Sequence, residues 1–127
     1  MNKTKKPIIW TISGADCSGG AGIAADIKTA HGLGVEICHL ITANTVQNSN
    51  ELIAVNPVTV QLLQQQVDAL HVDKVPSVIK GGLIANTEQV NWLIDSAYVY
   101  AAFHPPFSPE IQPHYNVGAI VSATIAP

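Results

Sequence analysis

Hydrophobic residues in the first hundred positions occur either in short continuous runs or at helical spacing. Residues 8–12 form a short apolar run rich in β-branched side chains, which is typical of a buried strand. Residues 21–33 carry apolar side chains three and four positions apart, which predicts a helix. The same patterns predict further strands at residues 35–43, 51–55 and 78–80, and helices that end near residues 70 and 94. Strand and helix therefore alternate, which predicts an α/β fold with a mostly parallel sheet and flanking helices.

Local signals predict where these helices begin and end. Gly32 and Gly34 are expected to stop the first helix, because glycine is the usual residue after a helix C-terminus. Asn56-Pro57 predicts an N-cap with proline at the first helical position of the second helix. Asn86 and Gln89 have the spacing of a capping box, so the third helix is expected to begin there.

The amino-acid composition and the strand–helix pattern of the chain change near its C-terminus. We predict an N-terminal part at residues 1–97 and a divergent, proline-rich tail at residues 98–127. Residues 101–113 contain four prolines, a composition that excludes both a helix and a central strand. Residues 117–125 have the composition of one more strand, but the strand–helix pattern does not continue.

Composition narrows the classes of function. The chain is 47% hydrophobic and 12% charged, and no apolar run is long enough to span a membrane, so no membrane partner is expected. The net charge of −3 and the lack of a basic stripe argue against nucleic acid as a partner. Cys17 and Cys38 have no metal-type spacing, and the start of the chain has no signal-peptide pattern. These features predict a reduced, cytoplasmic protein.

A glycine-rich loop at residues 14–22, Gly-Ala-Asp-Cys-Ser-Gly-Gly-Ala-Gly, joins the first strand to the first helix. Glycines let the backbone approach a ligand closely, and free N–H groups at a helix start attract polar or anionic groups. The loop lacks the Lys-Ser/Thr of a phosphate-binding P-loop and the first glycine of a nucleophile elbow. A tight turn that packs the helix against the strand explains the glycines equally well, so both interpretations remain open.

Asp26 interrupts the apolar face of the first helix. Ile23, Ile27, Ala30 and Leu33 form one apolar arc at helical spacing, and Asp26 falls inside it. A charge on a buried face is costly unless it is paired or serves a site. Asp26 is therefore a candidate functional residue, and an ion pair or a local backbone bond is the structural alternative.

Polar residues 42–48 close the second strand. Among them, the amide of Gln47 can both donate and accept hydrogen bonds at the edge of a heteroaromatic ring. A solvated loop would show the same composition. The five histidines are scattered and suggest neither a metal site nor a catalytic triad, so no catalytic or metal-binding residue is assigned.

Taken together, residues 10–29 closely resemble the opening of the hydroxymethylpyrimidine/phosphomethylpyrimidine kinases of thiamine biosynthesis. Residues 34–35, 41–43 and 46–48 also match that family, in order and at the right separations. The resemblance runs from residue 8 to residue 94 and implies a partial ribokinase-like fold. Members of this family use MgATP to phosphorylate 4-amino-5-hydroxymethyl-2-methylpyrimidine and then its monophosphate.

The resemblance implies which residues bind the pyrimidine. They are Gly14, Asp26, Thr45, Gln47 and Gly82, and Asp26 and Gln47 would hydrogen-bond the aminopyrimidine ring. The side chains of Asp26 and Gln47 are expected to point into one concavity beside the glycine-rich loop. The resemblance further implies ATP and Mg²⁺ as cofactors and a small-molecule pyrimidine as partner, and it allows a homodimer as in the family.

The chain departs from the family pattern at one strand end. Family members usually have Lys-Ile-Gly-Met-Leu where residues 79–83 read Ile-Lys-Gly-Gly-Leu. Gly82 therefore stands in place of a pocket methionine, and Lys80 is displaced by one position. A shift of one residue on a strand moves a side chain to the opposite face.

The family's second half holds the ATP groove and a glycine-rich anion hole, and residues 98–127 match neither. We therefore expect a truncated copy or part of a longer protein, inactive alone. The main alternative is a non-catalytic pyrimidine-binding or interaction module. A small dinucleotide-binding domain is a third, because residues 20–25 match that fingerprint, but Glu36 stands at the start of the second strand rather than near its end.

Overall fold

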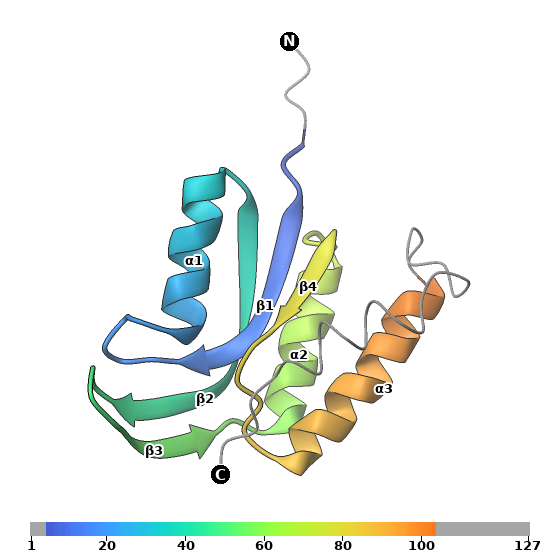
Figure 1. Cartoon of the computed structure of the whole chain (residues 1–127). Helices are drawn as coiled ribbons and strands as arrows, with labels where there is room; N and C mark the ends of the chain where they lie inside the picture. Colours follow the sequence, from blue (N-terminus) through green and yellow to red (C-terminus); the bar gives the residue numbers. More distant parts are fainter. Residues whose placement is uncertain (1–4, 104–127) are drawn as a thin grey trace.

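A computed structural model of the chain describes residues 5–103 (Figure 1). Its sheet has four strands in the order β3-β2-β1-β4. β1 pairs in parallel with β2 and β4, and β2 pairs antiparallel with β3. The elements are β1 (Ile8–Ala15), α1 (Gly22–Leu33), β2 (Glu36–Gln47), β3 (Leu52–Pro57), α2 (Val60–His71), β4 (Val78–Gly81) and α3 (Thr87–Phe103). The predicted α/β fold, with a mostly parallel sheet and flanking helices, is confirmed.

β1 lies inside the sheet and is buried on both faces, since successive side chains of a strand point to opposite sides. Trp10 and Ile12 point toward α2 and α3 and are 2% and 3% exposed. Thr11 and Ser13 are buried on the opposite face, beneath α1. The hydrophobic core on the α2/α3 face consists of Ile8, Trp10, Ile12, Leu40, Leu63, Ile84 and Leu93.

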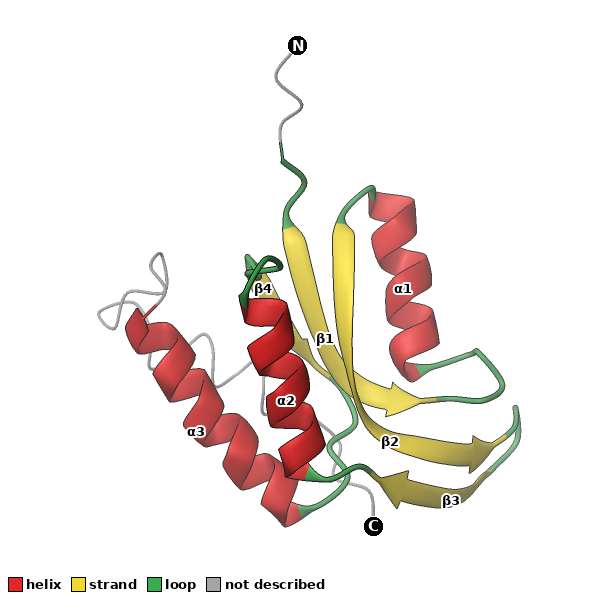
Figure 2. Ribbon diagram, turned by 180° about the vertical axis from the view of Figure 1, so that it is seen from behind, coloured by secondary structure: helices red, strands yellow, loops and turns green. Residues whose placement is uncertain are grey.

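The connections leave β1 in two directions. The chain passes through α1 to β2 on one side of β1, and it later passes through α2 to β4 on the other side. α2 and α3 lie next to each other, away from α1 (Figure 2). The reversal of strand order beside β1 is a topological switch point, where open α/β sheets bind ligands outside the carboxyl ends of their strands.

The start of α2 differs from the prediction. Asn56 and Pro57 are the last residues of β3 rather than the cap and first residue of a helix. The N-cap is Thr59, whose side chain accepts a hydrogen bond from the backbone N–H of Leu62 at 3.2 Å. Proline is tolerated in β3 because this strand lies at the edge of the sheet.

The ends of α1 and α3 also refine the predictions. Gly34 adopts a left-handed φ of 69° and ends α1, whereas Gly32 lies inside the helix. Asn86 caps α3 as expected, because its Oδ1 accepts a hydrogen bond from the Gln89 backbone N–H at 2.9 Å. α3 continues to Phe103, beyond residue 94 and into the segment where no helix was expected. Proline disfavours the helical conformation of the residue before it, so Pro105 is compatible with a helix that ends at Phe103.

Gln89 fixes α3 to the strand ends. Its side chain is 1% exposed, and its Nε2 donates to the carbonyl oxygens of Thr42 and Val58, both at 2.9 Å. Its Oε1 accepts from the backbone N–H of Ala85 at 3.0 Å. The Thr42 hydroxyl in turn donates to the carbonyl of Leu83 at 2.6 Å. These bonds hold the segment after β4 against β2, where the candidate site lies.

Candidate functional site

The turns that follow β1 and β4 lie against each other. Gly14, near the end of β1, is buried, and a Cβ atom placed on it would lie 2.8 Å from Cδ2 of Leu83. A Cβ atom on Gly82 would overlap the side chain of Ser13. Neither glycine can carry a side chain unless a neighbour moves. The structure thus brings two of the predicted site residues, Gly14 and Gly82, to the switch point beside β1.

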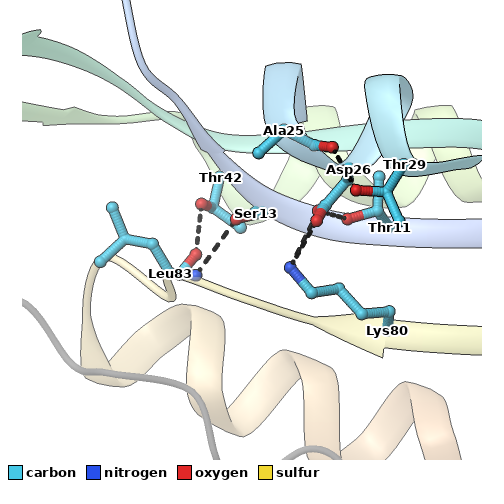
Figure 3. A network of polar contacts seen from close by, with 8 residues as sticks. All are labelled: Thr11, Ser13, Ala25, Asp26, Thr29, Thr42, Lys80 and Leu83. Carbon is cyan, nitrogen blue, oxygen red and sulfur yellow. Dashed lines mark hydrogen bonds and ion pairs between the residues drawn. The ribbon is translucent and has the colours of Figure 1, made fainter. Parts of the chain in front are cut away.

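Asp26 reaches the same region from α1 (Figure 3). Its carboxylate accepts a hydrogen bond from the Thr11 hydroxyl and forms an ion pair with Lys80. The Lys80 Nζ lies 3.0 Å from Oδ1 and 2.9 Å from Oδ2 of Asp26. Thr11 and Lys80 are register partners in β1 and β4, so both side chains point toward α1.

This ion pair is the structural alternative that the sequence left open for Asp26. It satisfies the carboxylate and so accounts for a charged residue on the covered side of α1. The displaced lysine behaves as its position predicts, because Lys80 projects away from the hydrophobic core under α2 and α3. Sequence reasoning noticed the displacement of Lys80 but not its partner, since the two residues are 54 positions apart.

Only part of the predicted apolar arc of α1 is buried. Ile23 and Ala30 are 6% and 4% exposed, whereas Ile27 and Leu33 are 39% and 71% exposed. α1 packs mainly on β1 and β2, so only a narrow stripe of the helix is covered. The expectation that the whole arc is buried was wrong for Ile27 and Leu33.

The end of β2 is bonded to the start of the glycine-rich loop. The Thr45 hydroxyl donates to the carbonyl of Ala15 at 2.8 Å, and the Cys17 Sγ donates to the backbone carbonyl of Gln47 at 3.1 Å. Thr45 and Gln47 lie at the end of β2, where the register of the pairing with β3 shifts between Val46 and Gln47. The structure places both beside the loop, while a concavity shared by Asp26 and Gln47 stays a prediction.

Asp16 organises the glycine-rich loop from within. Its carboxylate accepts hydrogen bonds from the Ser18 hydroxyl at 2.7 Å and from the backbone N–H groups of Ser18, Gly20 and Ala21 at 2.8, 3.0 and 2.9 Å. The Ser18 hydroxyl, and then these amides, hold the pKa of Asp16 below its usual value. An aspartate that bonds the backbone two residues ahead is a known turn signal, which the sequence carries at this point.

These bonds bear on the two interpretations left open for the loop, a ligand-binding loop and a tight turn. The N–H groups of Gly20 and Ala21, just before the start of α1, bind Asp16 and are not free for a polar or anionic ligand. Gly22 has a φ of 57°, and a Cβ atom on it would overlap the carbonyl oxygen of Gly14. A tight turn therefore explains this glycine without a ligand.

The described residues do not fit a nucleotide phosphate at this loop, because its amides are bonded to Asp16 and no P-loop lysine follows. Across residues 5–103, no group of three or more His, Cys, Asp or Glu side chains is arranged to hold a metal ion. His104 and His114 lie outside the described residues. Within the same part of the chain, no helix is long and apolar enough to cross a bilayer.

Comparison with known families identifies the class of protein. The sequence model described as phosphomethylpyrimidine kinase matches residues 16–104. The chain belongs to this family. The resemblance seen in residues 10–29 is thereby confirmed, and the ribokinase-like fold with it.

Relatives agree with the family assignment. A hydroxymethylpyrimidine/phosphomethylpyrimidine kinase of Bacillus subtilis is 45% identical over 80 residues, which are 63% of this chain and 30% of that protein. The crystal structure of a phosphomethylpyrimidine kinase from Clostridium difficile matches with a TM-score of 0.71 and 34% identity, covering 75% of this chain and 41% of that one. A Staphylococcus aureus pyridoxal kinase in complex with AMP-PCP and pyridoxal matches with a TM-score of 0.63 and 28% identity, covering 76% and 35% of the two chains. The chain therefore spans less than half the length of these relatives.

The bonds of Asp16 predict how the loop responds to pH. Because the native pKa of Asp16 is lowered, its stabilising effect is complete above the usual aspartate pKa and is lost only as the pH falls through the lower native value. In an NMR titration, the amide shifts of Gly20 and Ala21 should stay constant from neutral pH to below the usual aspartate range.

The substitution Asp16→Ala should shift both amides at neutral pH, whereas Asp95→Ala, at an exposed position of α3, should leave them unchanged. Amide shifts of Gly20 and Ala21 that are identical in Asp16→Ala and in the wild type would show that the carboxylate does not hold the loop.

Proposed function

We propose that this chain provides the pyrimidine-binding part of a hydroxymethylpyrimidine/phosphomethylpyrimidine kinase of thiamine biosynthesis. Such an enzyme phosphorylates 4-amino-5-hydroxymethyl-2-methylpyrimidine, and then its monophosphate, with ATP. The observation that supports this proposal most is the position of Asp26. In a chain of this family, the carboxylate contacts Thr11 of β1 and Lys80 of β4, the two strands that flank the switch point at which α/β sheets bind ligands.

The roles proposed for the five site residues follow from their chemistry. The Asp26 carboxylate would accept a hydrogen bond from the exocyclic amino group of the ring, and the Gln47 amide would donate to one ring position and accept from another. Gly14 and Gly82 would shape the site by letting the two turns pack closely against the side chains of Leu83 and Ser13. Thr45 would line the site from β2 while its hydroxyl remains bonded to Ala15.

We place the handling of ATP and Mg²⁺ outside residues 5–103. The glycine-rich loop is bonded to its own aspartate, and the chain spans 30% of the Bacillus subtilis relative. Phosphoryl transfer depends mainly on positioning both reactants and on stabilising the charge of the migrating group. A part of the enzyme that holds only the pyrimidine can supply neither the positioning of ATP nor this charge stabilisation. We further propose that the protein is cytoplasmic and forms a homodimer.

The second candidate function is a non-catalytic pyrimidine-binding or interaction module. The ion pair between Asp26 and Lys80 favours the interaction module within this alternative, because the carboxylate proposed to bind the ring already has a partner in the chain. Fusing residues 1–103 to the remaining part of a full-length relative separates the two candidates. A kinase half should regain activity in the fusion, and a binding module should not.

The proposal predicts weak but specific binding of 4-amino-5-hydroxymethyl-2-methylpyrimidine. The dissociation constant should be poorer than roughly 1 μM, because a small ligand that is only partly enclosed gains little burial. The substitution Gln47→Ala should weaken binding by about threefold to tenfold, which is the value of one or two neutral hydrogen bonds. Isothermal titration calorimetry measures both values.

Gln65→Ala is the matched control, because Gln65 is an exposed residue of α2 and should not affect the heat of binding. Equal heats for the wild type and Gln47→Ala would show that the glutamine makes no contact with the ring.

The proposal also predicts no turnover by the 127 residues alone. Positioning contributes roughly 7–11 kcal/mol to lowering a reaction barrier, and it requires both reactants to be held together. An assay for pyrimidine phosphate with MgATP, run beside the full-length Bacillus subtilis relative, should detect product only for the relative. ATP-dependent product from the pure 127-residue chain would contradict this prediction.

A further inference from the structure

The Asp26 carboxylate has little free capacity for a ligand. Lys80 contacts both of its oxygens, at 3.0 and 2.9 Å, and the Thr11 hydroxyl donates to one of them. A carboxylate offers about four acceptor positions, and these contacts use most of them. A ring that hydrogen-bonds Asp26 must therefore share the carboxylate with Lys80 or displace it.

The geometry of the sheet places Lys80 in this position. Lys80 pairs in register with Thr11 across β4 and β1, and both side chains point toward α1. A lysine one position earlier, as in the usual family pattern, would point to the opposite face. The contact with Asp26 thus results from the displacement of this lysine.

The lack of a side chain at Gly82 leaves space for the Lys80 ammonium group beside Ser13. A Cβ atom on Gly82 would lie 3.2 Å from the Lys80 Nζ and would overlap the Ser13 side chain. Any larger residue at position 82 would crowd the ammonium group and Ser13 together. The two departures from the family pattern, at positions 80 and 82, are therefore coupled in space.

We propose that Lys80 competes with the aminopyrimidine ring for the Asp26 carboxylate and so sets the affinity of this site. The inference rests on the function proposed above, in which Asp26 contacts the ring. The Lys80 side chain is 46% exposed, so its ammonium group can move into water when a ligand arrives. Partly exposed ion pairs are weak, so Lys80 reduces the affinity without abolishing binding.

The test is calorimetry with 4-amino-5-hydroxymethyl-2-methylpyrimidine above neutral pH. Lys80→Met keeps the aliphatic stem and removes the charge, and it should raise the affinity by about threefold to tenfold. Lys74→Met is the matched control, because it removes an ion pair with Glu36 at the opposite end of the sheet, and it should bind like the wild type. Added salt weakens the Asp26–Lys80 pair, so it should strengthen binding by the wild type and leave Lys80→Met unchanged.

Unchanged or weaker binding by a folded Lys80→Met variant would overturn the inference while leaving the proposed function intact. Should no variant bind the pyrimidine, the proposed function fails, and the inference fails with it. Cooperative thermal unfolding establishes that each variant is folded, and Lys80→Gln replaces Lys80→Met if the latter is not. In the wild type, saturating pyrimidine should also shift the NMR signals of the Lys80 side chain and not those of Lys74. Unshifted Lys80 signals at saturation would equally overturn the competition.

Discussion

The two faces of β1 carry opposite kinds of chemistry, and the arrangement of the other elements depends on this strand. Trp10 and Ile12 anchor the hydrophobic core under α2 and α3, while Thr11 and Ser13 present hydroxyl groups to α1. Because side chains alternate along a strand, one register fixes both faces at once. A slip of one residue in β1 would turn the hydroxyl groups of Thr11 and Ser13 into the hydrophobic core and would turn Trp10 toward α1 and Asp26. The packing of the hydrophobic core thus also fixes the positions of Thr11 and Lys80, which bind Asp26, and of the turn after β4.

The polar side chains of Asp26, Thr42 and Asp16 are all hydrogen-bonded within the described part of the chain. Asp26 is bonded by Thr11 and Lys80, the Thr42 hydroxyl donates to Leu83, and Asp16 uses the amides of its own loop. A ligand must therefore compete for bonds that already exist. Because its amides are bonded to Asp16, the loop differs from a phosphate-binding loop. The affinity role proposed for Lys80 follows from the same requirement, since Lys80 is the partner that a ligand of Asp26 would have to displace.

The order of the strands and helices could be predicted from the sequence because each element has a local signal. The apolar run of β1, the spacing in α1 and the cap at Asn86 are all encoded within a few residues. Asn56-Pro57 was misread because the same residues suit the end of an edge strand, and only the pairing with β2 distinguishes the two cases. Local signals also could not predict that α3 would extend to Phe103.

The candidate site was predictable only in part. The resemblance named Gly14, Asp26, Thr45, Gln47 and Gly82, and the structure brings Gly14, Asp26 and Gly82 together around Ser13 and Lys80. The contact between Asp26 and Lys80 could not be predicted, because it depends on the order of the strands and on the register of β4 against β1. The bonds of Asp16 depend on a turn conformation that the residue types permit but do not impose.

The central claim is that the pyrimidine binds where the ends of β1, β2 and β4 meet the first turns of α1. The most direct measurement is an NMR titration of the isotope-labelled 127-residue chain with 4-amino-5-hydroxymethyl-2-methylpyrimidine. The account predicts that the largest amide shifts occur at Gly14, Gln47 and Gly82, with smaller shifts in the loop between Asp16 and Gly22. Shifts confined to α2 and α3, or no shifts at millimolar ligand, would contradict it.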